Sequence, residues 1–253
     1  MFSQLAKIFN LGNHSIQLEE QESHIPEDLP IMCLDHLLQR KEPLRALVLG
    51  RRATGKSSLV KELIKCHIKE HGEDGSHVLV FHGPEQLQPF YANAKFEKGV
   101  TIKDHYDRDI LESYLQSNLN CPSKTFLFVF DNCFQYLSSR CEYLDQLVSG
   151  GYNCVFLPEH PLGISKSIRK MCNTLVLFKE HVYVHKKRVF DLWNLENVFY
   201  NFDIFQNMYS TATDAEYGYM LVDLIQDRTF VGRSLSKNNS CVTDSLETCS
   251  RSD

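Results

Sequence analysis

Residues 50–57 form a pattern whose glycines, lysine and hydroxyl can hold an anion. They read GRRATGKS, follow the short apolar run ALVL, and are followed by helix-forming residues. The glycines let the backbone curl so that successive N–H groups point inward, and the start of the next helix adds partial positive charge. Between a strand and a helix, G-x-x-x-x-G-K-[ST] is the pattern that holds nucleotide phosphates. We therefore predict a phosphate loop here.

The residues of this loop have distinct expected roles. Lys56 would place its ammonium group on the β and γ phosphates, and the Ser57 hydroxyl would bind Mg²⁺, which prefers oxygen ligands. The predicted cofactors are therefore ATP and Mg²⁺. The predicted nucleotide-binding set is Gly50, Arg51, Arg52, Ala53, Thr54, Gly55, Lys56, Ser57 and Ser58. The alternative is a glycine turn before an ordinary basic helix, which the flanking strand and helix patterns disfavour.

A second part of the site is expected at the end of the hydrophobic run FLFVFD, residues 126–131. An acid at the carboxyl end of a buried strand in the same sheet usually completes magnesium coordination. We therefore predict Asp131 and Ser57 as the metal-binding pair. The alternative is that Asp131 only ends its strand as a turn residue. The next residue is Asn132, and an amide can orient water but cannot take its proton.

The elements that must position these residues alternate between strand-like and helical patterns. Strands are expected at ALVLG, HVLVFHG, VTIKDHY, TFLFVFDN, CVFLPEH, TLVLFKE and YGYMLVDLI. Helices are expected at about 56–70, 108–116 and 136–148, and an aromatic-rich helical region follows residue 180. Several strands are apolar on both faces, which indicates a parallel sheet between two helix layers. The fold class is α/β, a P-loop NTPase three-layer sandwich with a mostly parallel central sheet.

We expect three parts along the chain. Residues 1–43 would form an N-terminal extension packed on the core, residues 44–232 the ATPase domain, and residues 233–253 a disordered tail rich in Ser, Asn and Asp. The longest apolar runs are far shorter than the roughly 20 residues needed to cross a bilayer. With nine scattered cysteines and no full signal peptide, a soluble intracellular protein with reduced thiols is expected.

The net charge argues against a DNA-binding surface that covers the whole protein, and the placement of the histidines argues against a metal site. The 27 basic and 32 acidic side chains give a net charge of -5, so any DNA contact must be local. His67 and His71 stand four residues apart and could share a metal, but no cysteine or acidic pair completes a ligand set. We interpret this pair as part of a solvated helix face.

Taken together, the motifs resemble one family. The pairing of LVLGRRATGKSSL with FLFVFDNC, followed by Pro161-Leu162-Gly163-Ile164 and TLVLFKE, resembles the poxvirus-type virion DNA-packaging ATPases of large DNA viruses. These belong to the FtsK/HerA group of ring-forming motors. The resemblance covers about Leu44 to Ile225. It implies a RecA/FtsK-HerA-like fold, ATP hydrolysis and a homo-oligomeric ring.

The same resemblance implies partners and a location. The ring would move double-stranded DNA, the viral genome, into a capsid and would contact capsid or portal proteins. No membrane span is expected. The protein would act in the host cytoplasm, at the viral factory, with the virion as a second location.

Two positions depart from the family pattern. The family usually has a second acid after the magnesium aspartate, where this chain has Asn132, and a glutamine that senses the γ-phosphate, where this chain has Glu159. We expect the strands before these two residues to be neighbours, so a carboxylate and an amide have exchanged places. Our hypothesis is that Glu159 activates water and Asn132 is the neutral sensor. The alternative is that Glu159 only ends a strand and hydrolysis is slow or absent. The catalytic set is Lys56, Asp131, Asn132 and Glu159.

Other charged and aromatic residues keep two interpretations each. Arg51 and Arg52 contact phosphate or a neighbouring subunit, or form a solvated loop tip. Arg140 and Arg169 are candidates for an arginine donated to the adjacent ATP in a ring, or they form surface ion pairs. The basic run 186–188 is expected to be solvated rather than bound to DNA. The aromatic cluster Trp193, Phe199, Tyr200, Phe202 and Phe205 is expected to be core or subunit interface rather than a base-stacking platform.

Two other functions remain open from the sequence. A nucleoside or nucleotide kinase shares the phosphate loop, but residues 160–190 supply only scattered basic side chains instead of an arginine-rich lid. Asn132 is also consistent with an assembly protein that does not hydrolyse ATP and binds it only to stabilise its structure. A GTPase is disfavoured because no N-K-x-D motif is visible.

Overall fold

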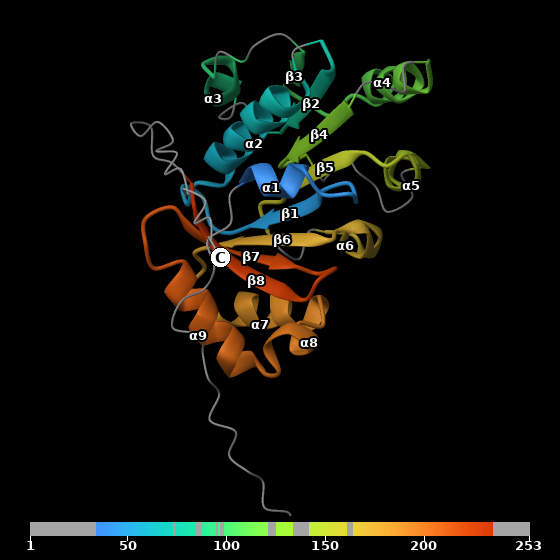
Figure 1. Ribbon diagram of the computed structural model, residues 1–253. Helices are drawn as coiled ribbons and strands as arrows, with labels where there is room; N and C mark the ends of the chain where they lie inside the picture. Colours follow the sequence, from blue (N-terminus) through green and yellow to red (C-terminus); the bar gives the residue numbers. More distant parts are fainter. Residues whose placement is uncertain are drawn as a thin grey trace, which may run out of the picture.

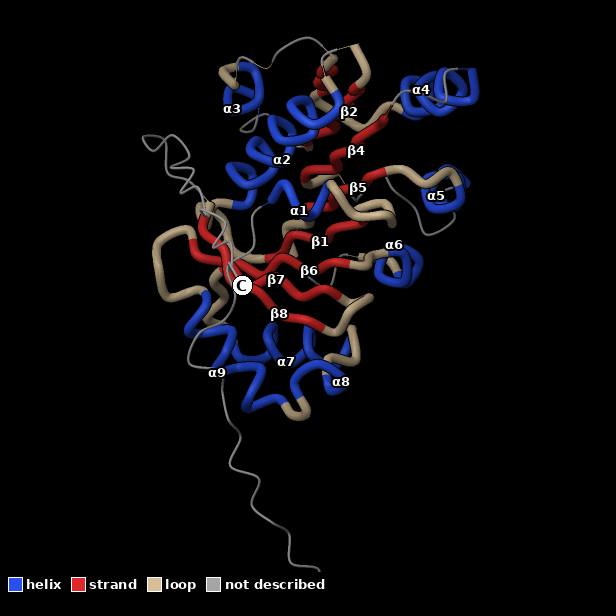
Figure 2. Tube along the Cα trace, in the orientation of Figure 1, coloured by secondary structure: helices blue, strands red, loops and turns tan. Residues whose placement is uncertain are grey.

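The fold is an α/β sandwich built on one mixed sheet (Figures 1 and 2). The computed structural model describes residues 34–72, 74–83, 88–94, 96, 99–120, 125–133, 142–160 and 164–234. Within these ranges, the sheet has eight strands in the order β3-β2-β4-β5-β1-β6-β7-β8. The pairs from β3 to β6 are parallel, and β7 and β8 are antiparallel additions. The predicted fold class, with its mostly parallel sheet, is confirmed.

The strands coincide with the apolar runs of the sequence. Their bounds are β1 Arg45–Leu49, β2 Ser76–His82, β3 Val100–Lys103, β4 Thr125–Asp131, β5 Asn153–Leu157, β6 Thr174–Phe178, β7 Gly218–Asp223 and β8 Arg228–Arg233. Strands β4, β5, β1 and β6 lie in the middle of the sheet and are almost wholly buried. This explains why they are apolar on both faces rather than alternating.

Helices cover both faces of the sheet. On one face lie α1 Leu34–Leu38, α2 Lys56–His71 and α3 Gln88–Ala92. On the other lie α4 Arg108–Asn120, α5 Glu142–Ser149, α6 Lys166–Met171, α7 Tyr183–Leu192, α8 Glu196–Phe199 and α9 Phe202–Ala212. Each layer has its own apolar cluster, so the sheet separates two cores.

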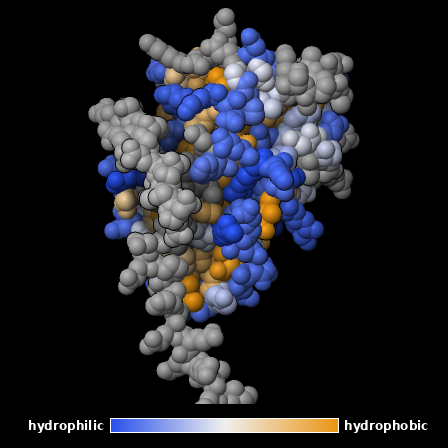
Figure 3. Space-filling view, in the orientation of Figure 1, coloured by the Kyte–Doolittle hydropathy of each residue, from blue (hydrophilic) through white to orange (hydrophobic). Residues whose placement is uncertain are grey.

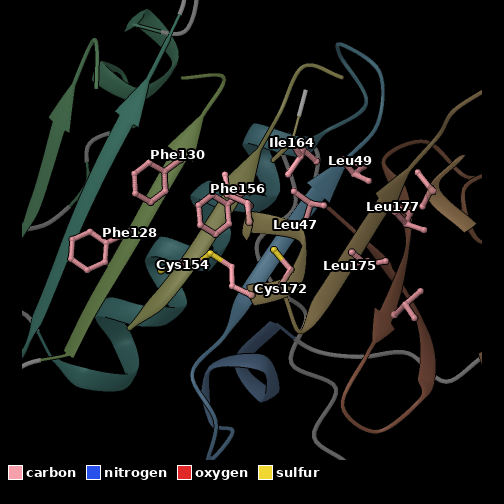
Figure 4. Packing of buried hydrophobic residues seen from close by; sticks show 14 of the residues in the cluster. Leu47, Leu49, Phe128, Phe130, Cys154, Phe156, Ile164, Cys172, Leu175 and Leu177 are labelled. Atoms are coloured by element: carbon pink, nitrogen blue, oxygen red, sulfur yellow. The ribbon is translucent and has the colours of Figure 1, made fainter. Parts of the chain in front are cut away.

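The alternation within β4 shows how one strand serves both cores. Phe126, Phe128 and Phe130 belong to the cluster shared with α4 and α5, whereas Leu127 and Val129 belong to the cluster shared with α2. The phenyl ring of Phe130 stacks on Phe156 of β5 with centroids 5.2 Å apart. Figure 4 shows these rings beside the aliphatic side chains of β1 and β6. The apolar core therefore extends to the carboxyl ends of β4, β5 and β1.

Several elements differ from the sequence expectations. Helix α3 and strand β8 were not predicted; α3 is only five residues long, and β8 is an edge strand with little buried surface. The helix predicted near 136–148 is observed as α5, which begins at Glu142, and residues 134–141 lie outside the described residues. Arg140 and Pro161 to Gly163 also lie outside them.

The predicted domain boundaries stay predictions. Residues 1–33 and 235–253 lie outside the described residues. Within the predicted N-terminal extension, α1 packs against α2, with Leu37 and Leu38 in the same apolar cluster. At the other end, β8 extends to Arg233, the first residue of the predicted tail.

His67 is buried, which corrects the interpretation of a solvated helix face. It follows Val60, Leu63 and Ile64 at helical spacing, so it lies on the face of α2 that packs on the sheet. Burial lowers the pKa of His67 to about 4, so the imidazole is neutral. Its ring makes an edge contact with His71. In the part of the chain that is described, no three metal-binding side chains gather at one place.

The aromatic region after residue 180 is largely core. Phe199, Phe202 and Phe205 are buried and pack on one another, whereas Tyr200 is exposed. On the face in Figure 3, hydrophilic residues cover most of the described surface, with hydrophobic residues in small patches. None of the described helices combines the length and apolar character that a bilayer crossing requires.

Candidate active site

The site lies where the carboxyl ends of neighbouring parallel strands meet. Strand β1 ends at Leu49 and leads into the phosphate loop, and β4 ends at Asp131. Strand β5 lies between them and leads from Leu157 to Glu159. Its register pairs Leu157 with Asp131, so β4 and β5 are neighbours as expected. The order β4-β5-β1 therefore places Glu159 between the loop and Asp131.

The phosphate loop requires its two glycines. Gly50 has φ 147°, and a Cβ there would lie 2.6 Å from Cβ of Phe178, which leaves no room for a side chain. Gly55 has φ 105° and is the N-cap of α2, where no side chain caps the helix. The first N–H groups of a helix have no intrahelical partner and carry partial positive charge. The start of α2 can therefore receive an anion.

Lys56 is folded across the loop. Its Nζ donates to the carbonyl oxygens of Gly50 and Arg51, both at 2.6 Å. Burial lowers the pKa of Lys56, and the Asp131 carboxylate opposes this shift. The ammonium group is thus held over the inside of the loop by backbone oxygens, which a phosphate could replace.

Asp131 is fixed by two hydroxyl groups. Ser57 Oγ donates to its Oδ2 at 3.2 Å, and the hydroxyl of Tyr91 donates to the same oxygen at 2.7 Å. Only 5% of Asp131 is exposed. Burial raises the pKa of Asp131, and the hydrogen bonds from Tyr91 and Ser57 oppose the rise. The predicted metal pair is therefore in direct contact, with Ser57 in the first turn of α2 and Asp131 at the end of β4.

The donors around Asp131 suit a small divalent cation. A carboxylate and a hydroxyl are hard oxygen ligands, and Mg²⁺ is usually bound by one or two carboxylates together with substrate phosphates. The hydrogen bond between Ser57 and Asp131 brings both oxygens to one point at the loop. The residues present therefore fit Mg²⁺.

Tyr91 is a site residue that the sequence did not reveal. It lies in α3, is fully buried, and stacks on His82 with ring centroids 5.6 Å apart. His82 is the last residue of β2 and pairs with Asp131 in the sheet register. Tyr91 lacked a sequence signal because α3 is a five-residue helix without clear periodicity.

Glu159 is held by an arginine of the loop. Arg52 forms an ion pair with Glu159, and the side chains are 76% and 37% exposed. The hydrogen bond from Arg52 lowers the pKa of Glu159 most, and a hydrogen bond from the Asn132 amide adds to the effect. Asn132 has φ 52°, a left-handed conformation that Asn tolerates, and its N–H donates to the Leu157 carbonyl at 2.8 Å. The carboxylate and the amide thus face each other.

The predicted residues surround one cavity. Its volume is about 520 Å³. It is lined by Arg51, Arg52, Ala53, Gly55, Lys56, Ser57, Ser58, Phe90, Asp131, Asn132, Leu157, Pro158, Glu159 and Tyr217. The structure therefore brings most of the predicted loop together with Asp131, Asn132 and Glu159, and it adds Phe90 and Tyr217.

The other basic candidates make local contacts. Arg169 is half-buried and donates to the Ile164 carbonyl at 2.7 Å, at the end of the segment 161–164. Lys187 pairs with Asp191 one turn further along α7. Neither residue lines the cavity, so the described chain offers Arg51 and Arg52 as the arginines of this site.

A phosphate loop on β1 and an acid on β4, separated by one inserted strand, define the fold of a P-loop NTPase. Similar solved structures carry the same fold. The genome packaging NTPase B204 from Sulfolobus turreted icosahedral virus 2, in complex with AMP, is 13% identical with a TM-score of 0.56, covering 78% of this chain and all of that one. B204, the DNA-packaging ATPase from Sulfolobus turreted icosahedral virus, is 12% identical with a TM-score of 0.58, covering 76% of this chain and 97% of that one.

A bacterial protein is also similar in fold. The cytoplasmic domain of the type VII secretion ATPase EccC from Thermomonospora curvata is 11% identical with a TM-score of 0.50 over 79% of this chain and 26% of that one. The chain thus has the fold of P-loop ATPases of the FtsK/HerA type. No protein-family model matches the sequence. No curated protein matches it either.

Proposed function

We propose that this chain is an ATP-hydrolysing motor subunit that packages viral genomic DNA into a capsid as a homo-oligomeric ring. The observation that carries the nucleotide-binding part is the contact between Ser57 and Asp131 beside Lys56, at the rim of a cavity of about 520 Å³. A lysine, a hydroxyl and a buried carboxylate at the start of an uncapped helix are the groups that a magnesium-bound triphosphate needs.

The packaging part of the proposal is supported by the similar folds. Structures of B204 from Sulfolobus turreted icosahedral virus 2 contain AMP, AMPPCP or ATP-gammaS, and B204 is described as a genome packaging NTPase. By analogy, double-stranded DNA and capsid or portal proteins would be the partners of this chain. The host cytoplasm, at the viral factory, and the virion are the proposed locations.

Hydrolysis would proceed by attack of water on the γ-phosphate, in line with the bond to the β-phosphate. Lys56 and the loop N–H groups would hold the β and γ oxygens, where negative charge develops. Mg²⁺, held by Ser57 and Asp131, would neutralise charge on the phosphates. The Glu159 carboxylate would accept the proton of the attacking water while Asn132 orients that water. The bridging oxygen would leave with ADP.

Arg52 must change partner for this chemistry. A carboxylate that is ion-paired to a guanidinium is a poor proton acceptor, because the positive charge stabilises its ionised form. Arg52 comes from the loop that would hold the phosphates, so the γ-phosphate can compete with Glu159 for the guanidinium. In the proposed cycle, triphosphate binding draws Arg52 away and leaves Glu159 free to accept a proton.

The same contacts favour a second candidate, an assembly protein that binds ATP without hydrolysing it. Asn132 cannot accept a proton, and Glu159 is already paired with Arg52. If Arg52 kept this partner after ATP binds, the site would lack a base. Binding would then be strong and turnover slow.

A DNA-stimulated ATPase assay on the purified chain, with its oligomeric state monitored, tests the proposal. We expect phosphate release without an added nucleoside, increasing with double-stranded DNA and lost in Lys56→Ala. Release that requires a nucleoside acceptor would indicate a kinase instead. ATP binding without phosphate release would favour the assembly protein.

The role of Glu159 has its own test. Glu159→Gln should lower kcat by about 100-fold or more, because the general base is removed while the shape of the side chain is kept. The double exchange Asn132→Asp with Glu159→Gln should restore part of the activity by returning the carboxylate to the other strand. Hydrolysis by Glu159→Gln at the parental rate would exclude Glu159 as the base.

A further inference from the structure

The antiparallel strand β7 brings a tyrosine to the phosphate loop. Strand β6 ends at the site edge, and the register pairs its last residue, Phe178, with Tyr219 near the start of β7. Because β7 runs in the opposite direction, the residues just before it lie at the same sheet edge as the loop. These residues include Tyr217, which a parallel strand would have placed at the far edge.

The backbone of Tyr217 is held in an unfavourable conformation. Its φ is 59°, in the left-handed region that an aromatic residue rarely adopts. Two hydrogen bonds fix the turn: Gly218 N–H donates to the Ala215 carbonyl at 2.9 Å, and Ser234 N–H donates to the Tyr217 carbonyl at 3.0 Å. Such strained residues persist where the surroundings hold them, and they are common at ligand sites.

The ring of Tyr217 packs against the last glycine of the loop. A Cβ on Gly55 would lie 3.1 Å from Cδ1 and 3.4 Å from Cβ of Tyr217, so the tyrosine covers the point where the loop becomes α2. Tyr217 is nevertheless only half-buried. Its exposed part faces the large cavity and a second cavity of about 350 Å³.

The second cavity lies on the opposite side of the loop from Asp131. It is lined by Ala53, Thr54, Lys179, Asp214, Ala215, Glu216, Tyr217 and Gly218. Asp131 and Glu159 mark the end of the site that suits magnesium and the γ-phosphate. A nucleotide bound in this direction would leave the loop at its other end, beside Tyr217.

We infer that Tyr217 is the platform on which the nucleobase stacks, and that the cavity beside it receives the nucleoside. This inference rests on the proposed nucleotide-binding function. A planar ring at the loop offers a π face to a base, and the exposed carboxylates of Asp214 and Glu216 can accept hydrogen bonds from ribose hydroxyls or a base amino group. Since every base has a π face, stacking on Tyr217 supplies affinity more than selectivity.

Phe90 is the other aromatic residue that lines the large cavity, and it provides a matched control. It belongs to α3, and the next residue, Tyr91, bonds to Asp131. Phe90 therefore lies at the metal end of the site, whereas Tyr217 lies at the other end. A base can stack on one of these residues but not on both.

The test compares two probes, ATP and inorganic tripolyphosphate, on the full chain with Mg²⁺. Tripolyphosphate can use the loop but has no base to stack. Replacing Tyr217 by Ala should weaken ATP binding by roughly 10- to 100-fold, as for other base–aromatic stacks, and leave tripolyphosphate binding unchanged. Tyr217→Phe keeps the ring and should bind ATP as the parent does. Phe90→Ala changes the metal end, so any loss of affinity there should be the same for ATP and for tripolyphosphate.

The outcomes separate the inference from the function it rests on. If the parent binds neither probe, nucleotide binding itself is wrong. Equal ATP affinity in the parent and Tyr217→Ala, with both folded by thermal unfolding, would overturn the platform. A loss of ATP affinity without a loss of tripolyphosphate affinity in Phe90→Ala would also overturn it, because the base would then lie on α3. If Tyr217→Ala lost both probes equally, Tyr217 would be shaping the loop instead of binding a base, which also contradicts the inference.

Discussion

The two carboxylates of the site lie in opposite environments. Asp131 is 5% exposed and accepts two hydroxyl hydrogen bonds, and burial raises its pKa. Glu159 is 37% exposed at the side chain and pairs with an arginine, and the Arg52 guanidinium lowers its pKa. One acid is built into the core, and the other is at the surface of the cavity.

This difference suggests separate roles for the two acids, cation binding for Asp131 and activation of water for Glu159. The group that would hold the cation is fixed by the same packing that folds the sheet, so it is ready before a ligand arrives. The group that would activate water is exposed, and its present partner comes from the loop itself. We therefore expect changes on the Asp131 side to alter ligand binding and stability together, and changes on the Glu159 side to alter turnover with little effect on stability.

The largest effect is expected for Asp131→Asn. The amide keeps an acceptor for Ser57 and Tyr91 but removes the charge, so magnesium-dependent ATP affinity and hydrolysis should each fall by roughly 100-fold or more. Because burial disfavours the charged form of Asp131, the nucleotide-free variant should unfold at a higher temperature. Thermal unfolding and nucleotide titration with and without Mg²⁺ measure both. A lower unfolding temperature with unchanged ATP affinity would show that Asp131 has a structural role and does not bind the cation.

Tyr91→Phe tests whether Asp131 depends on the hydrogen bond from the Tyr91 hydroxyl, in addition to the one from Ser57. Losing a hydrogen bond to a charged group should cost about 1.5–3 kcal/mol of unfolding free energy and raise the Mg²⁺ concentration needed for ATP binding. The control is Tyr143→Phe, whose hydroxyl donates to the Glu112 carboxylate at 2.9 Å away from the site. Denaturant unfolding and Mg²⁺ titrations distinguish the two. The control should lose stability without changing the Mg²⁺ requirement, and equal Mg²⁺ responses would remove Tyr91 from the site.

The sequence could predict the parts of the site that depend on local motifs, but not the parts that depend on tertiary placement. The phosphate loop and Asp131 were visible because each is a short motif at the end of an apolar run, and the α/β fold followed from the alternation of such runs. The structure brings Ser57 and Asp131 into hydrogen-bond contact, and their roles in binding phosphate and Mg²⁺ stay predictions.

The residues that the sequence did not reveal depend on tertiary placement. Tyr91 reaches Asp131 from a short helix, and Tyr217 reaches the loop only because β7 is antiparallel. Strand β8, which helps to hold Tyr217, is a partly exposed edge strand with a weak pattern. By contrast, the burial of His67 was readable from its helical spacing after Val60 and Ile64, because all three lie on the apolar face of α2.

The role of Glu159 can be tested through the pH dependence of kcat/KM. The pKa of Glu159 is lowered by Arg52, so its carboxylate stays ionised to a lower pH than an ordinary glutamate. If Glu159 is the base, the acid limb of kcat/KM, which reports the free enzyme, should lie below the usual glutamate range. Arg52→Gln removes the charge, so the limb should move to higher pH whatever happens to the rate. A limb that stays in place in Arg52→Gln would show that the ion pair does not set the titration of the base.

The smallest effect is expected for the contribution of the ion pair between Arg52 and Glu159 to the free energy of unfolding. Arg52 is 76% exposed, and pairs between exposed side chains contribute about 0–1 kcal/mol because water screens them and ordering long side chains costs entropy. Arg52→Ala and Glu159→Gln should therefore unfold within about 1 kcal/mol of the parent in the absence of nucleotide. Denaturant unfolding of these variants beside Tyr91→Phe compares the two sides directly. If Arg52→Ala lost as much unfolding free energy as Tyr91→Phe, the ion pair between Arg52 and Glu159 would be important for stability. Glu159 would then have a structural role like that of Asp131.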